Sequence, residues 1–392
     1  MKEYIQGQKN NKMKICTYLI GCFLLLIPAD TFEILPGISI LRILALLMIF
    51  SCFLYARDSK IKLNWIIILL LGYIFFSVFQ IFYTDYISNT ISKVATITMY
   101  TVLLISINLT NFNDKEKEFL HKCFFYSTWM AVILILLFRA EFEGRLTISI
   151  LGNKVEDPNQ FCGYFIPGIV YYFYLFLNNK NQKIKNILIL SLFLYLVFLT
   201  GSRGGLLAIL GGMFAVFILY LKQNKNNKFW NKLIKVIFIS ILMYLIVIFI
   251  LNKINPELAA RFSIENVLSS GGTGRTEIWE YYINLYGQSN LWYKLFGYGL
   301  GSLSSIYRVA HNTWIESLLE SGIIGSILLI SIMLHSLKIV SKNNNIQLMS
   351  SFFALIILTL SLSLLSYKLL WGYLIIAIIF KNEKKEGNIK NE

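Results

Sequence analysis

The chain is organised as apolar runs separated by short polar segments. A helix needs ~20 consecutive apolar residues to cross the hydrocarbon core of a bilayer. Runs near this length can be placed at residues 15–27, 38–55, 63–82, 91–109, 119–138, 161–177, 184–199, 206–221, 233–251, 313–337, 346–365 and 369–380. The pattern predicts an all-α, polytopic integral membrane protein with about twelve transmembrane helices.

One long polar segment, residues 252–310, interrupts this series. It divides the predicted fold into a transmembrane bundle of about nine helices (1–251), a large extracytoplasmic loop (252–310) and C-terminal helices with a cytoplasmic tail (311–392). Within the loop, Gly274-Arg275 opens a predicted amphipathic helix whose Trp279 and Tyr282 would lie at the membrane interface or stack on sugar rings. We expect residues 297–301 to form a flexible turn, because three of them are glycine.

Composition agrees with a membrane protein. Over 392 residues the mean hydropathy is +0.63, with 56% hydrophobic and 15% charged residues, so no large soluble domain fits beside the spans. Lysines gather in segments that would be cytoplasmic if both termini are cytoplasmic, and the short loops 28–37 and 84–90 have neither Lys nor Arg. The net charge of +15 therefore indicates topology and contact with anionic lipids, not nucleic-acid binding.

Arginine is distributed differently from lysine. Six of the eight arginines fall on the predicted outer side, and Arg42 lies just within the outer end of the second span. A guanidinium is suited to bidentate binding of phosphate or carboxylate, so the distribution predicts an outward-facing anion site. The six are Arg139, Arg145, Arg203, Arg261, Arg275 and Arg308. For Arg139 and Arg145 we favour a simpler interpretation, in which both contact lipid headgroups at the interface.

His311 is the one histidine that the predicted topology places outside. If the next helix begins at Asn312 or Thr313, its positive dipole end keeps the imidazole neutral near pH 7, and a neutral imidazole can act as a base. The alternative is a capping or interfacial histidine. Asn312, Glu316 and Glu320 follow at i, i+4 spacing, and such carboxylates should face a wet cavity or pair with arginine. Gly322 and Ser326 have the spacing of close helix packing.

Two shorter motifs precede the loop. Residues 200–205 (Thr-Gly-Ser-Arg-Gly-Gly) form a tight turn that fixes Arg203 at the membrane surface, although any short interhelical turn favours glycine. Asp157 before Pro158 is best explained as a helix N-cap. In the functional alternative, Asp157 or Asn159 binds sugar hydroxyls or orients an arginine. The five cysteines lack CxxC spacing, and no acidic cluster suggests a metal site.

Taken in order, these motifs resemble the O-antigen ligase and Wzy-type polysaccharide polymerase family of bacterial membrane glycosyltransferases. The resemblance covers roughly residues 150–340. It rests on Asp157-Pro158-Asn159, Thr200-Gly201-Ser202-Arg203-Gly204, Gly274-Arg275 with Trp279, and His311-Asn312 with Leu318, Glu320, Gly322 and Gly325. It implies transfer of glycan from an undecaprenyl-diphosphate carrier on the outer face of the bacterial cell (inner) membrane.

The resemblance implies that Arg203, Arg275 and His311 are catalytic, without a metal or other cofactor. Arginines would stabilise the departing diphosphate, and His311 would accept the proton of the attacking hydroxyl. The further substrate-binding candidates are Arg308, Asn312, Asp157, Asn159, Glu316 and Arg42. The expected partners are an undecaprenyl-diphosphate-linked oligosaccharide, membrane lipids, and flippase and chain-length regulator proteins.

Polymerase and ligase share this chemistry and differ in the acceptor, which is another lipid-linked repeat unit or lipid A core. The Lys-, Asn- and Ile-rich composition suggests an AT-rich genome of the kind common in Gram-positive bacteria, which favours a capsule or surface-polysaccharide polymerase. A transporter or flippase would place ionisable residues at mid-bilayer, whereas here the polar groups concentrate at the outer face. A noncatalytic scaffold would tolerate loss of Arg203, Arg275 and His311.

Overall fold

The computed structural model of the protein describes residues 13–35, 37–56, 64–150, 155–223, 249, 252–253, 255–263, 274–365 and 367–382. The predicted span 233–251 lies outside these residues, apart from residue 249.

Helices make up most of the described chain. Five are long and apolar enough to cross a membrane by length and composition, counting α7 and α8 as one, and five shorter apolar helices accompany them. The helices are α2 (Ile15–Leu26), α3 (Ile40–Tyr55), α4 (Trp65–Gln80), α5 (Ile87–Leu109), α6 (Asp114–Phe138), α7 (Pro158–Gly163), α8 (Ile166–Asn178), α9 (Lys183–Leu199), α10 (Arg203–Gln223), α12 (Pro256–Ala260), α14 (Arg275–Gln288), α15 (Leu291–Phe296), α16 (Leu303–Ile306), α17 (Thr313–Lys342), α18 (Ile346–Leu358) and α19 (Lys368–Ile379). The predicted helical membrane fold is confirmed at this level, while the number of twelve spans and the three-part division stay predictions.

Two short antiparallel hairpins, which the apolar pattern did not predict, join some of these helices. Strand β1 (Glu33–Leu35) pairs with β2 (Ile38–Ser39), and β3 (Arg139–Phe142) pairs with β4 (Arg145–Ile148). Every residue of β4 is buried, whereas β3 is mostly exposed. The second hairpin thus folds the chain back after α6 and buries Arg145.

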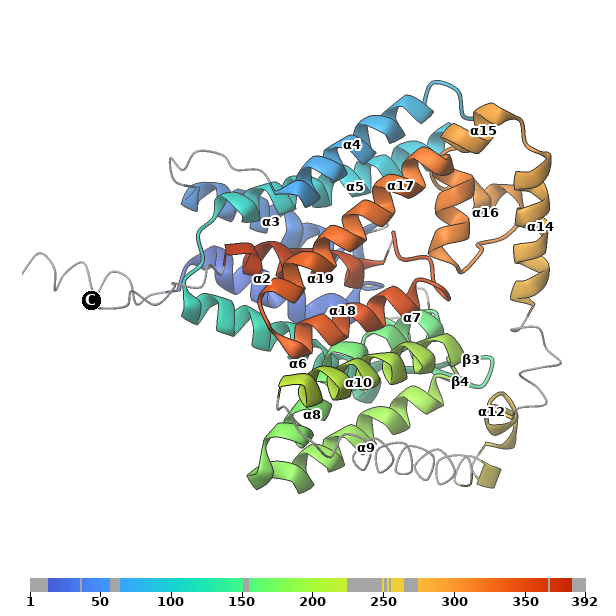
Figure 1. The fold of residues 1–392 in the computed structure, drawn as a ribbon. Helices are drawn as coiled ribbons and strands as arrows, with labels where there is room; N and C mark the ends of the chain where they lie inside the picture. The colour runs from blue at the N-terminus through green and yellow to red at the C-terminus, as the bar shows by residue number, and fades with distance from the viewer. Residues whose placement is uncertain are drawn as a thin grey trace, which may run out of the picture.

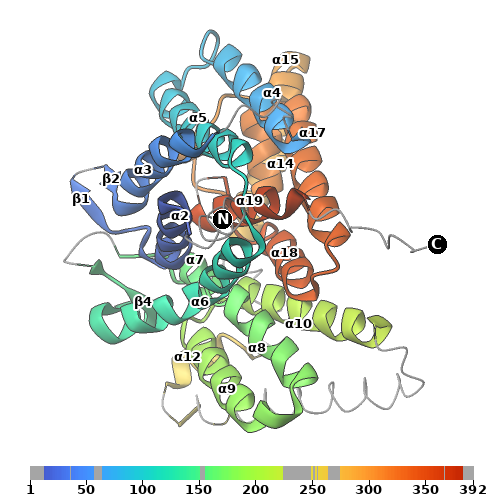
Figure 2. The same ribbon diagram turned by 90° about the vertical axis from the view of Figure 1, so that its left-hand side faces the viewer.

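The short helices gather at one end of the bundle. In Figure 1, α14, α15 and α16 lie at the right-hand end, which α4, α5 and α17 also reach. The β3–β4 hairpin and α12 lie toward the same end, which we call the loop end. Figure 2 views the bundle from the opposite end, with α19 near its centre. Every residue of α19 is buried, so this helix forms the middle of the apolar core.

Helix α17 is broken at Gly322, whose φ of 62° and ψ of −169° are not helical. The break frees backbone carbonyls of the preceding turn, and an unpaired buried carbonyl is costly. Tyr298 N donates to Leu319 O (2.8 Å) and Gly299 N donates to Glu320 O (3.0 Å), so a distant loop supplies the missing donors. Gly322 therefore interrupts the helix, and its lack of a side chain lets the backbone of Leu295 and Gly297 approach closely.

The loop that fills this break, residues 296–301, is fastened by side chains of the α4–α5 hairpin. We call it the glycine loop. The bonds run from Gln80 Nε2 to Phe296 O and Glu320 O (2.7 Å each), from Thr84 Oγ1 to Tyr298 O (2.6 Å), from Thr90 Oγ1 to Leu300 O (3.1 Å) and from Asn89 Nδ2 to Gly301 O (3.2 Å). The expectation of a flexible turn was wrong, because these carbonyls are held by protein donors that lie far away in the sequence.

We expect Gly297→Ala to destabilise the protein by about 2–4 kcal/mol. A residue with a Cβ would be strained in this left-handed backbone conformation, and neighbouring backbone atoms already occupy the space of the Cβ. Gly297 has φ of 78°, and its added Cβ would lie 2.6 Å from the nitrogen of Gly322. The matched control is Gly37→Ala, since Gly37 has the same φ of 78° but nothing within 4 Å of an added Cβ. The measurement is thermal unfolding in detergent, and equal midpoints for the two variants would contradict the close contact.

Candidate functional site

A cavity of about 540 Å³ lies at the loop end. It brings together segments far apart in the sequence: the N-terminal half of α14, the connection from α16 to α17, and α7. The lining residues are Asn159, Arg275, Ile278, Ser304, Tyr307, Arg308, Val309 and His311. Four of the residues singled out from the sequence, Asn159, Arg275, Arg308 and His311, therefore line one cavity.

His311 occupies the position just before the N-cap of α17. Asn312 is that N-cap, its Oδ1 accepting from Trp314 N (3.0 Å) and Ile315 N (3.2 Å) while its Nδ2 donates to Leu360 O (3.2 Å). Burial lowers the pKa of His311 below its usual 6.5, and the positive charge of Arg275 lowers it further. His311 is therefore neutral near pH 7 and can accept a proton. The Asn312 amide is used in holding the helix start, which positions His311.

Arg275 is the first residue of α14, after Gly274, which provides no side-chain cap. Its NH1 donates to Ser361 O (3.1 Å), and burial lowers its pKa. A positive side chain at the positive end of a helix dipole is electrostatically unfavourable. An anion bound at this place would interact favourably with both the guanidinium and the helix terminus.

The predicted span 346–365 is wrong at its C-terminal end, because α18 stops at Leu358. The turn that follows supplies carbonyls to the site instead of continuing the helix. Thr359 O accepts from Thr313 N (2.9 Å), and the carbonyls of Leu360 and Ser361 accept from Asn312 and Arg275. The interruption thus holds the start of α17 and the start of α14 against the same short segment.

Arg145 lies beside the cavity and is 5% exposed, so its assignment as an interfacial lipid-contacting residue was wrong. Its Nε donates to Thr200 O and its NH2 donates to Asn159 Oδ1, each at 2.8 Å. Burial, followed by repulsion from Arg261, lowers the pKa of Arg145 to about 10. Arg139, in contrast, has an exposed side chain paired with Glu141 (3.0 Å).

Asp157 caps α7, as the sequence indicated, and its Oδ1 accepts from Asn159 N (2.8 Å) and Asn159 Nδ2 (2.9 Å). The amide group of Asn159 therefore connects Asp157 to Arg145. This arrangement orients the Asn159 side chain at the cavity wall and links it to the turn at residue 200.

Positive charge is in excess around the cavity. The charge of Arg261 lowers the pKa of both Arg145 and Arg275, and Asp157 is the carboxylate that opposes the shift at Arg145, Arg275 and His311 most strongly. Arg203 belongs to the same region, since its Nε donates to Arg261 O (2.6 Å). It does not, however, line the cavity among the described residues. Like charges gathered in a partly buried place predict an anionic ligand.

Two further candidates lie outside the cavity lining. Arg42 donates to Gly37 O in the β1–β2 hairpin, in the neighbourhood of the Lys368–Asp30 ion pair (3.3 Å). Glu316 accepts a hydrogen bond from the Ser363 hydroxyl group. The structure therefore does not bring Arg42 or Glu316 to the cavity wall, and Glu316 has a local partner instead of an arginine.

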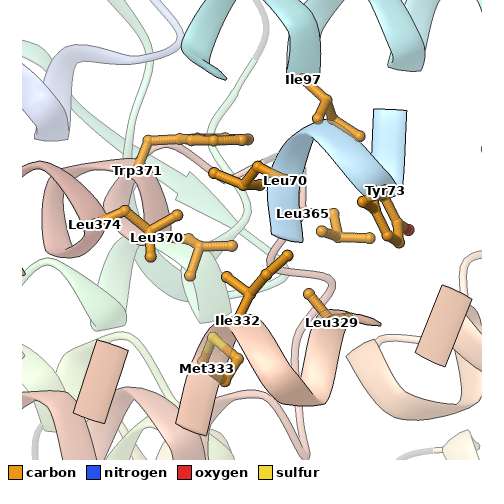
Figure 3. Close-up of a pocket in the computed structure, with 10 residues that line it drawn as sticks. All are labelled: Leu70, Tyr73, Ile97, Leu329, Ile332, Met333, Leu365, Leu370, Trp371 and Leu374. Carbon is orange, nitrogen blue, oxygen red and sulfur yellow. The ribbon is translucent and has the colours of Figure 1, made fainter. Parts of the chain in front are cut away.

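A second cavity lies within the bundle, between α4, α5, α17 and α19 (Figure 3). Its lining is apolar apart from Tyr73 and Trp371, and its volume of about 10 Å³ is no larger than one water molecule requires. It cannot hold an anion, unlike the larger, arginine-lined cavity at the loop end. In the part of the chain that the structure describes, no group of three or more His, Cys, Asp or Glu residues could hold a metal ion.

Sequence reasoning missed Arg145 and Tyr307 as site residues. Arg145 was missed because it belongs to the β3–β4 hairpin, which the apolar pattern did not predict. The hairpin places the Arg145 side chain beside Thr200 and Asn159. Tyr307 directly precedes Arg308 in the polar segment, and this adjacency was a signal that could have drawn attention to it.

Comparisons with known proteins agree with this architecture. Residues 188–330 match a family described as O-antigen ligase, which confirms the family resemblance over that segment. A search of curated proteins gave no match. Among solved structures, the fold is similar to that of one chain in a structure titled "Structural coordination of polymerization and crosslinking by a peptidoglycan synthase complex". The TM-score is 0.50 at 13% identity, covering 82% of this chain and 98% of that chain.

Proposed function

We propose that this chain, whose residues 188–330 match the O-antigen ligase family, is a metal-independent glycosyltransferase that polymerises lipid-linked oligosaccharides. It would transfer glycan from an undecaprenyl-diphosphate carrier to a hydroxyl group of another lipid-linked repeat unit, on the outer face of the bacterial cell membrane. The observation that carries the proposal is the cavity in which a neutral histidine lies beside two arginines, at one end of a membrane bundle.

The chemistry follows from these side chains. The acceptor hydroxyl oxygen attacks the anomeric carbon, the bond from that carbon to the diphosphate oxygen breaks, and the electron pair leaves with the diphosphate. Arg275 and Arg308 stabilise the charge that develops on the leaving group. His311 takes the hydroxyl proton as general base and later releases it to solvent. Arg145 and Asp157 act through Asn159 as positioning residues.

A bound diphosphate would also balance the positive charge of the surrounding arginines. Its negative oxygens suit planar guanidinium groups, whereas a neutral glycan would leave the charge excess uncompensated. The same cavity would serve a ligase, which transfers completed glycan to lipid A core or another surface acceptor, because only the acceptor differs.

The experiment is complementation of a deletion strain with the wild-type gene and with an Arg275→Ala, His311→Ala double variant, at matched membrane levels. We expect the wild type to restore long surface glycan and the double variant to accumulate single repeat units. Full-length polymer retained on its carrier lipid would indicate the ligase, and normal long chains would rule out catalysis at this cavity. Transfer by purified wild-type protein should also persist in EDTA.

A further inference from the structure

The cavity has a second wall, which is aromatic. Tyr307 lines the cavity and is 46% exposed, and Tyr281 of α14 lies next to it and is 41% exposed. Their ring centroids are 4.8 Å apart with an interplanar angle of 39°. We call this pair the aromatic platform. It lies beside charged groups, because the Arg308 guanidinium is 5.5 Å from the centroid of the Tyr307 ring.

The platform is held in place by the buried side chain of Tyr282. Its hydroxyl group donates to Leu303 O (3.0 Å) and accepts from Arg308 N (3.2 Å), so the backbone is fixed on both sides of Tyr307. Tyr282 is fully buried and packs against Leu303, Ala310 and Leu319. Tyr281 is its neighbour on α14, so both rings of the platform are attached to one small apolar cluster. A ligand would therefore meet a prearranged surface and lose little affinity to ordering it.

The chemistry of the platform differs from that of the arginine wall. The face of an aromatic ring carries partial negative charge and attracts the weakly positive C–H groups on the apolar face of a pyranose ring. Polar groups for the sugar hydroxyls stand in the same cavity, namely the Ser304 hydroxyl and the Asn159 amide. A volume of about 540 Å³ lies within the range of roughly 300–1,000 Å³ typical of small-molecule sites, so a diphosphate and an attached sugar fit together.

We propose that Tyr307, supported by Tyr281, stacks against the sugar ring that is attached directly to the carrier diphosphate. This assignment rests on the proposed function and adds to it a specificity-determining subsite. Arg308 connects the two parts of the site, because its guanidinium lies 5.5 Å from the centroid of the Tyr307 ring. The aromatic platform thus distinguishes a glycan-bearing carrier from the bare carrier that is released after transfer.

The test is equilibrium binding of two probes to the full chain purified in lipid nanodiscs. One probe is undecaprenyl diphosphate, and the other is the same lipid carrying a single N-acetylhexosamine. We expect the wild type to bind the sugar-bearing probe more tightly. Tyr307→Leu should weaken binding of the sugar-bearing probe by about three- to tenfold more than binding of bare undecaprenyl diphosphate. Tyr307→Phe should keep the preference, because the ring remains.

The control variant is Tyr126→Leu, which changes a half-exposed tyrosine paired with Tyr171 (6.1 Å) on α6, outside the cavity lining. It should alter neither affinity. Equal weakening of both probes by Tyr307→Leu would assign the ring a structural role and overturn the subsite. Equal affinity of the wild type for both probes would also overturn it while leaving the diphosphate site standing. If the wild type binds neither probe, the proposed function itself fails.

Discussion

Replacing His311 with asparagine is expected to slow glycan transfer by about 10²–10⁴-fold, the usual contribution of a general base. Asparagine is the sharper substitution because His311 has a positive φ of 49°, which asparagine tolerates better than alanine does. The variant should therefore keep the backbone and lose the proton acceptor. The measurement is the transfer rate of the purified protein with a polyprenyl-diphosphate-linked oligosaccharide, together with its unfolding midpoint.

The pH dependence tests the same role. Burial and the charge of Arg275 lower the pKa of His311 below 6.5. The active neutral form is therefore lost only when the pH falls through this lowered pKa. The acid limb of kcat/KM should lie below pH 6.5 for the wild type and should be absent in His311→Asn. A limb above pH 7, or an unchanged rate in the variant, would rule out His311 as the base.

Replacing Arg275 with glutamine is expected to reduce the transfer rate by about 10²–10³-fold, because the developing charge on the diphosphate loses a partly buried cationic partner. Arg275→Lys should recover only part of this loss, since an ammonium keeps the charge but cannot form the bidentate contact. The rate and the affinity for undecaprenyl diphosphate are both measured. Loss of rate greater than loss of affinity would indicate stabilisation of the transition state.

The matched control for Arg275 is Arg139→Gln, which removes an exposed arginine paired with Glu141. It should retain the wild-type rate. If both variants lost activity equally, the effect would reflect general surface charge, and the assignment of Arg275 to the leaving group would be abandoned.

The positions of the long helices could be predicted because a helix that crosses the bilayer needs a long run of apolar residues. The positions at which helices are interrupted could not be predicted in this way. Gly322 has the same small-residue spacing as a packing glycine, and only the glycine loop, brought in by the α4–α5 hairpin, makes a helix interruption favourable there. Helix α18 ends at Leu358, before a stretch in which Thr and Ser alternate with Leu, and the next carbonyls bond to Asn312 and Arg275.

The residues that line the cavity could be predicted where a residue carried its own chemical signal. His311 and Asn159 stood out as polar groups at span ends, Arg275 and Arg308 stood out as arginines of the polar loop, and all four line one cavity. Arg145 was misread because its sequence position resembles an interfacial arginine, and its burial depends on an unpredicted hairpin. Arg42 does not line this cavity, since its position at a span end did not indicate that its side chain bonds within the β1–β2 hairpin.

The fastening of the glycine loop has a consequence for modularity. The family match spans residues 188–330, yet the donors that hold the loop come from Gln80, Thr84 and Thr90, and Asn159 and Ser361 also lie outside it. A chain trimmed to the matching segment would lack both the loop's anchors and part of the cavity. The matched segment therefore identifies the family but does not form an independent functional unit. Exchanging it between proteins should transfer activity only when the α4–α5 hairpin is exchanged together with it.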